Sequence, residues 1–321
     1  MSREILKETG NLARQTAVRA AWVQWSSLGA PTADASVATS IIDPEALVLV
    51  SLAMLDEEQR LADMLAWWAR VGSRLLSVQR MKVLAEAYPE RVRERLGRFA
   101  RSAMESKDAR WRRYAAEEPL AARTRTDKEA KPPNLASAST LMLRLRAGFG
   151  VSAKADVLTF LLGIGERHAT IQAIERATGY AGVTVRDAAR DMALARLIRE
   201  TEERPVSYYA RRQPWTALLE LGGDGANRAA IPPWRFWTNV FAFLAHVDEL
   251  ARSETAASGS EYVQSSHARD LFETHRSAFI NNRLDMPDPE DYRGAAYLTS
   301  FRDTVQILSD WIVLHAYQLA S

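Results

Sequence analysis

Two arginines spaced four residues apart, Arg186 and Arg190, carry the most specific chemistry in the sequence. On a helix this spacing places both side chains on one face. Each guanidinium can bind a guanine edge or a phosphate through two parallel hydrogen bonds. Asp187 and Asp191 follow the two arginines directly and offset their charge. The pattern predicts a helix face that can bind an anionic partner.

Sequence signatures of catalysis are missing. The chain has no cysteine, which excludes disulfides, thiolate metal sites and a cysteine nucleophile. It contains no Walker loop, zinc-protease motif, nucleophile elbow or dinucleotide fingerprint. His267 and His275 are eight residues apart, which on a helix turns their side chains about 80° from each other and argues against a joint metal site. We therefore expect no enzyme activity, no catalytic residue, no metal and no cofactor.

The composition is that of a globular protein with more than one domain. The chain has 321 residues, of which 47% are hydrophobic and 26% charged, and this length exceeds one ordinary core. The first residues lack the apolar segment of a signal peptide. The most apolar stretch, Ala46 to Leu55, is far shorter than the ~20 residues of a membrane helix. We expect a cytoplasmic protein with no membrane partner.

Residues 1–116 are predicted to form a helical domain. Asp43-Pro44-Glu45 is a strong helix start, because Asp can cap free N–H groups, Pro is preorganised there and Glu favours the positive end of the helix dipole. The apolar run that follows predicts a buried central helix. Ser77 can cap another helix, and a long basic helix is expected from about Glu90 toward Tyr114. Residues 117–139, rich in Ala, Ser, Pro and charge, are predicted to be a linker.

Residues 212–321 are predicted to form a second helical domain. Its last helix, about Gly294 to Leu319, carries a strict 3,4 repeat that is apolar except for one histidine: Leu298, Phe301, Val305, Leu308, Ile312, His315 and Leu319. The repeat predicts a dimer interface or, with equal weight, packing within the chain. We expect three tryptophans in the core rather than around an apolar ligand: Trp215, Trp234 and Trp237.

Residues 140–211 are predicted to form a small domain of three helices and a hairpin. Ser152 can cap a helix from Ala153 to Leu162, and Thr170 a short second helix that ends at Gly179, where the turn asks for left-handed backbone. The third helix is expected to begin at Thr184. Two strands then follow, around the turn ETEERP (200–205).

The runs IQAIERATGYAGVTVRDAARDM (171–192) and LARLI (194–198) resemble the winged helix-turn-helix family of bacterial transcription regulators. In that family the third helix enters the major groove of DNA. The resemblance implies DNA contacts by Thr184, Arg186 and Arg190, with Ala181 and Gly182 at the turn, Arg199 and Arg204 flanking the wing, and Thr170 presenting a helix N-terminus to a phosphate. This chain departs from the family in having Glu175 where a small Ala is usual, and in a wing with three acids against two bases.

The charge distribution is compatible with a polyanion across the middle of the sequence. Residues 80–131 carry 15 basic and 9 acidic groups, although a solvated helix face gives the same pattern. We expect a mainly α-helical transcription regulator that binds double-stranded DNA as a homodimer, with flanking helical domains that dimerise or sense a small-molecule effector. The alternative is an adaptor of a multi-protein assembly, for example a defence system, that uses the winged helix to contact a protein partner.

Overall fold

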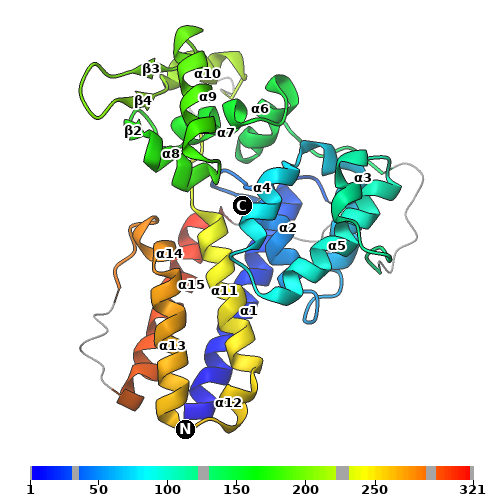
Figure 1. Cartoon of the computed structure of the whole chain (residues 1–321), viewed down its shortest axis with the longest axis vertical. Helices are drawn as coiled ribbons and strands as arrows, with labels where there is room; N and C mark the ends of the chain where they lie inside the picture. The colour runs from blue at the N-terminus through cyan, green and yellow to red at the C-terminus, as the bar shows by residue number, and fades with distance from the viewer. Residues whose placement is uncertain (1, 31–35, 122–129, 222–230, 287–293, 319–321) are drawn as a thin grey trace.

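A computed structural model of the chain describes residues 2–30, 36–121, 130–221, 231–286 and 294–318. The chain is mainly helical, with a small three-stranded antiparallel sheet in its middle part (Figure 1). The helical class expected from the sequence is confirmed. Within these described ranges, no helix is both long and apolar enough to cross a membrane.

Segments from both ends of the sequence build one helical bundle. Helix α1 (Ser2–Ser27) packs against α11 (Trp237–Arg252) and α15 (Tyr297–Ala316), and α13 (Glu261–His275) completes the bundle (Figure 1). Small residues let α1 approach its neighbours closely: a Cβ at Gly10 would overlap the Cβ of Ala251. Short elements connect and close the bundle: α12 (Glu254–Ser258), α14 (Ser277–Ile280), η5 (Gly294–Ala296), and the antiparallel pair β1 (Val37–Ala38) and β5 (Tyr317–Gln318).

The apolar repeat of α15 is buried within the chain. Its side chains join the same hydrophobic cluster as α1 and α11, and each is at most 1% exposed: Leu298, Phe301, Val305, Leu308 and Ile312. A second copy cannot reach them, so the repeat marks packing within the chain and not a dimer interface. Leu319, the last member of the predicted repeat, lies outside the described residues.

A second layer of helices covers the bundle, namely α2 (Pro44–Ala53), α3 (Leu61–Val71), α4 (Val78–Ala85) and α5 (Glu90–Glu105). All of α2 is buried, and both predicted caps are present, since Asp43 accepts from the Ala46 N–H and Ser77 from the Arg80 N–H. The predicted long basic helix is wrong beyond Glu105. There the chain turns through left-handed backbone at Lys107 and continues as a 3₁₀ helix, η2 (Ala109–Tyr114). A further 3₁₀ turn, η1 (Ser73–Leu75), joins α3 to α4.

We call these two layers the helical body. Buried side chains from residues 6–143 and 237–312 form one continuous hydrophobic cluster within it. The ranges 1–116 and 212–321, expected to be separate domains, therefore share a core.

The middle of the chain forms a second core, which we call the central module (residues 141–218; upper part of Figure 1). After η3 (Ala138–Thr140), its helices are α6 (Leu141–Phe149), α7 (Ala153–Gly163), α8 (Ile171–Thr178), α9 (Gly182–Leu194) and α10 (Arg212–Leu218). Its sheet has the order β2-β4-β3, with β2 (Ala169–Thr170), β3 (Arg199–Glu200) and β4 (Ser207–Tyr209).

Local predictions for the central module hold in most places. Thr170 caps α8, and Gly179 ends it with left-handed backbone at φ 73°. Helix α9 begins at Gly182, two residues before the predicted Thr184, because extended backbone at Ala181 already starts the turn into the helix. Ser152 makes no capping hydrogen bond; its hydroxyl instead donates to the Gly150 carbonyl at 3.5 Å.

The three tryptophans lie in separate places. Trp237 stacks on Phe241 in the helical body, with ring centroids 5.0 Å apart. Trp234 follows the central module in sequence and meets Phe160 of its core edge-on. Trp215 lies in the central module beside α6. They pack in cores and do not line one common ligand pocket.

Replacing Gly10 with Ala is expected to lower the free energy of unfolding by about 1–3 kcal/mol, because the new methyl overpacks the α1–α11 contact. Adding Ala251→Gly in the same chain should recover part of the loss, since the two side chains compete for one space. Gly148→Ala is the control, because its Cβ would meet no atom within 4 Å. Chemical denaturation measures all three; equal losses from Gly10→Ala and Gly148→Ala would contradict the contact.

Candidate nucleic-acid interface and the ion pairs that orient it

The exposed face of α9 carries the two arginines singled out in the sequence. Arg186, Arg190 and Thr184 are exposed, while the opposite face of the helix, including Val185 and Met192, is buried in the central module. Arg186 and Arg190 make no ion pair with any carboxylate of the described residues, so their hydrogen-bonding groups are available to a ligand.

Strand β4 lies within electrostatic reach of the same face. Burial and the charge of Glu200 raise the pKa of the Tyr208 hydroxyl, and Arg190 and Arg186 act in the opposite direction. The charges of both guanidiniums therefore reach the Tyr208 hydroxyl of β4.

Two acidic side chains near the arginines, Asp191 and Glu175, lie beside other groups of the central module. Asp191 forms an ion pair with Lys154 of α7 at 2.7 Å, which directs its charge away from the arginines. Glu175 of α8 lies at the start of α9, where its Oε2 would be 3.0 Å from a Cβ at Gly182. Glycine at position 182 thus makes room for the Glu175 carboxylate. A carboxylate there also interacts favourably with the positive end of the α9 dipole.

The remaining predicted site residues are dispersed. Ala181 is exposed at the turn, and Arg204 is exposed between β3 and β4. The Thr170 hydroxyl accepts from the Ala173 N–H at 3.3 Å, so its oxygen already caps α8. Arg199 pairs across the sheet with Tyr209, whereas Glu200 pairs with Tyr208. Because successive strand residues point to opposite faces, Arg199 lies on the other side of the sheet from Arg186 and Arg190.

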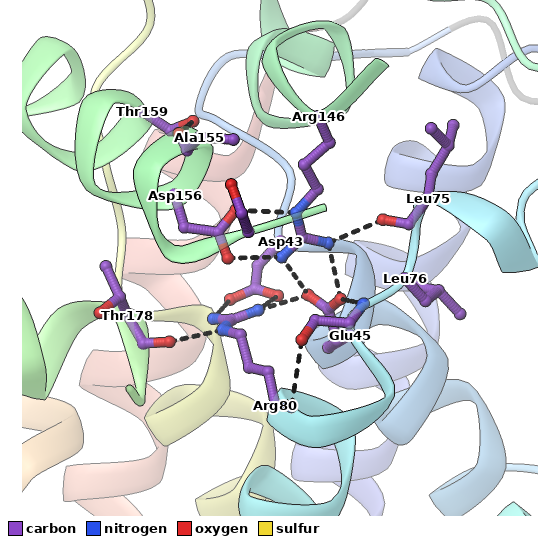
Figure 2. A network of polar contacts seen from close by, with 12 residues as sticks. Asp43, Glu45, Leu75, Leu76, Arg80, Arg146, Ala155, Asp156, Thr159 and Thr178 are labelled. Carbon is purple, nitrogen blue, oxygen red and sulfur yellow. Dashed lines mark hydrogen bonds and ion pairs between the residues drawn. The ribbon is translucent and has the colours of Figure 1, made fainter. Parts of the chain in front are cut away.

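Two buried arginines tie the central module to the helical body (Figure 2). Arg146 of α6 donates to both carboxylate oxygens of Asp156 at 2.7 Å and to those of Glu45 at 2.6 and 3.1 Å. Arg80 of α4 donates to Asp43 and to Glu45 at the start of α2. Every one of these side chains is at most 4% exposed. We call these five residues the buried ion cluster.

Backbone groups complete the buried ion cluster. The Arg80 Nε donates at 2.6 Å to the carbonyl of Thr178, the last residue of α8, and Arg146 donates at 2.9 Å to the Leu75 carbonyl. The Ser77 N–H donates to Glu45 at 2.8 Å. The end of α8, and hence the turn into α9, is therefore fixed directly to α4.

The buried ion cluster is not among our predictions from the sequence, although the sequence contains a sign of it. Glu45 is the one charged side chain in α2, whose other residues are apolar or small, and Arg146 lies in the largely apolar run LMLRLRAGF of α6. A charge at a position that a helix must bury requires an opposite charge from another element.

The charges of the cluster stabilise one another. Burial acts to raise the pKa of the Asp43 carboxyl, but the charge and hydrogen bonds of Arg80 outweigh it and hold this pKa below its ordinary value. Burial acts to lower the pKa of Arg80, and Asp43 and Glu45 reverse that effect and raise it. Asp43 and Arg80 are thus held in their ionised forms, as a buried ion pair requires.

No protein-family model, curated protein or solved structure matches the chain. Across the part of the chain that the structure describes, no group of three His, Asp or Glu side chains is placed to hold a metal ion. The surface of α9 and its surroundings are therefore the features of the molecule that bear on its function.

Asp156→Asn is expected to lower the free energy of unfolding by about 3–5 kcal/mol, because it leaves the buried Arg146 without part of its compensating charge. Asp191→Asn is the matched control. It removes the same charge from an ion pair of the same 2.7 Å length, but Lys154 and Asp191 are 51% and 58% exposed, so the loss should stay within about 1 kcal/mol. Similar losses in urea denaturation would show that the buried ion cluster does not stabilise the fold.

The stability of the protein is expected to fall in acid partly through Asp43. In the folded protein the pKa of the Asp43 carboxyl is below its ordinary value of 3.8. The free energy of unfolding that this group contributes is therefore complete above about pH 3.8 and is lost as the pH falls through the folded pKa. Asp56, Glu58 and Asp108 also have lowered pKa values and share this dependence.

Urea midpoints of the parent protein and of variants, measured between about pH 5 and 2, isolate the part of the acid-induced loss of stability that is due to Asp43. Asp43→Asn should show a shallower loss than the parent protein, and Asp191→Asn the full loss. An unchanged slope in Asp43→Asn would contradict the assignment.

Proposed function

We propose that the protein is a DNA-binding transcription regulator whose central module is a winged helix-turn-helix. The order α7, β2, α8, α9, β3, β4 supports this proposal, as does the left-handed Gly179 between α8 and α9. The observation that carries it is the exposed pair Arg186 and Arg190 on the helix that follows this tight turn, since neither forms an ion pair with a described carboxylate.

In the proposed complex α9 enters the major groove of duplex DNA. Arg186 and Arg190 bind guanine edges or phosphates in bidentate fashion, and Thr184 donates a hydrogen bond near the start of the helix. The hairpin contributes little, because Glu200, Glu202 and Glu203 repel phosphates. Arg199 has no part in this face.

The basic segment 80–131 is not included in the proposal. Several of its described arginines form ion pairs within the helical body, since Arg91 pairs with Asp248 at 3.0 Å and Arg95 with Asp56 at 2.5 Å. Figure 1 also places α5 on the opposite side of the molecule from the β3–β4 hairpin. The excess positive charge here is therefore better explained by a solvated and internally paired surface.

A second copy is part of the proposal on energetic grounds. One helix with two arginines supplies few base contacts, and two copies on a palindromic site would double them. The buried repeat of α15 is excluded as the contact between such copies.

Selection from a random duplex library with the full chain, at about 150 mM salt to suppress purely electrostatic binding, is expected to enrich one sequence. Arg186→Ala with Arg190→Ala should weaken binding to that sequence at least tenfold and abolish the preference, since each bidentate pair contributes about 1–3 kcal/mol of discrimination. The control is Arg276→Ala with Arg302→Ala, which removes the same charge from the helical body and should leave the preference intact.

Two results would contradict the proposal. A double variant that binds the selected duplex as well as the parent protein would exclude α9 as the recognition helix. If no duplex is enriched and the protein instead co-purifies stoichiometrically with another protein, the adaptor function replaces DNA binding.

A further inference from the structure

A small apolar hollow opens on the central module where α10 meets the end of α9 and strand β3. It has a volume of about 210 Å³. Helix α10 and strand β3, which contribute to its lining, lie on the outer part of the central module, away from the helical body (Figure 1). Its apolar lining consists of five residues: Leu197, Ile198, Pro214, Trp215 and Leu218. It is separate from the face that bears Arg186 and Arg190, because Arg199, which lines the hollow, points to the opposite side of the sheet from Tyr208.

Large apolar side chains surround this hollow without being covered. Leu218 is 69% exposed, Phe149 49% and Leu197 36%. The ring of Phe149 meets Trp215 edge-on at 6.1 Å, which extends the apolar surface from α10 to α6. Single exposed apolar residues are common, but a contiguous group around a cavity indicates a surface that another molecule covers.

Three arginines complete the lining, namely Arg196, Arg199 and Arg211. None of them forms an ion pair with a carboxylate among the described residues, and no acidic side chain lines the hollow. The neighbouring Arg212 behaves differently, because it turns inward and donates to the carbonyls of Leu162 and Ile231. The hollow thus combines an apolar floor with guanidiniums that have no counter-charge among the described residues.

We propose that this groove, which we call the arginine groove, docks an acidic amphipathic segment of a partner protein. A large apolar side chain of the segment enters the hollow beside Trp215, and its carboxylates pair with the three guanidiniums in bidentate fashion. Trp and Arg are the residue types that most often dominate the binding energy of protein interfaces.

Charge complementarity selects this occupant over two others. A second copy docked on the same groove would set arginines against arginines, because a twofold contact repeats each patch on both partners. A DNA backbone would satisfy the arginines, but it would leave Leu218 and Phe149 against phosphates and water. Only an acidic and apolar chain compensates both parts of the lining.

Fluorescence anisotropy with the full chain and labelled synthetic peptides tests the proposal. The first peptide alternates Asp or Glu with Leu and Phe, the second has Lys in place of every acid, and the third has Ser in place of every apolar residue. Saturable binding is expected for the first peptide, and at least tenfold weaker binding for the other two. Absence of binding by the first peptide, or equal binding by the first and second, would overturn the proposal.

Variants of the chain locate the binding site. Arg211→Glu and Leu218→Ser should each weaken binding of the acidic peptide at least tenfold. The matched controls are Arg112→Glu on η2 and Leu314→Ser on α15. Leu314 is 75% exposed, and both control variants should bind the peptide as the parent protein does. Equal losses in the controls would place the peptide elsewhere.

The test is independent of DNA binding. The variant with both Arg186→Ala and Arg190→Ala should bind the acidic peptide as the parent protein does. Arg211→Glu should bind the selected duplex as the parent protein does. If Arg211→Glu lost the duplex and kept the peptide, the arginine groove would be part of a nucleic-acid surface and the docking proposal would fail.

Discussion

The relative placement of the two cores depends on five charged side chains that water does not reach. Removing guanidiniums and carboxylates from water is costly, and mutual attraction offsets that cost only where every hydrogen-bonding group finds a partner. Arg80 and Arg146 meet this condition by binding groups from α2, from the turn before α4, and from α7 and α8. Because these groups converge in only one arrangement of the central module on the helical body, the cluster selects that arrangement.

Helix dipoles account for the surplus of acid in the cluster. Three carboxylates face two guanidiniums, but Asp43 and Glu45 lie at the N-terminus of α2, where free N–H groups carry partial positive charge. Arg80, in turn, meets the carbonyl end of α8, where the partial charge is negative. The two helix termini thus complement the ions, and the geometry of α2 and α8 is part of the electrostatic balance.

Much of the local structure could be predicted from the sequence because its causes are local. Asp43, Ser77 and Thr170 cap helices through hydrogen bonds that span three residues, and Gly179 meets a backbone requirement of its own turn. The buried ion cluster joins residues up to 101 positions apart, so no local pattern pairs Glu45 with Arg146. The repeat of α15 was ambiguous for the same reason, since a periodic apolar face shows that it is covered but not by which helix.

The bundle of α1 with α11 and α15 also has a consequence for how the polypeptide forms during synthesis. The Thr16 hydroxyl donates to that of Ser309, 293 residues further along the chain, so α1 leaves the ribosome long before α11 and α15 exist, although α2 follows it closely. The part of its apolar face that packs on α11 and α15 stays uncovered during that interval, while the central module can assemble from segments close in sequence. The bundle is therefore the part of the fold that synthesis completes last, because α15 closes it.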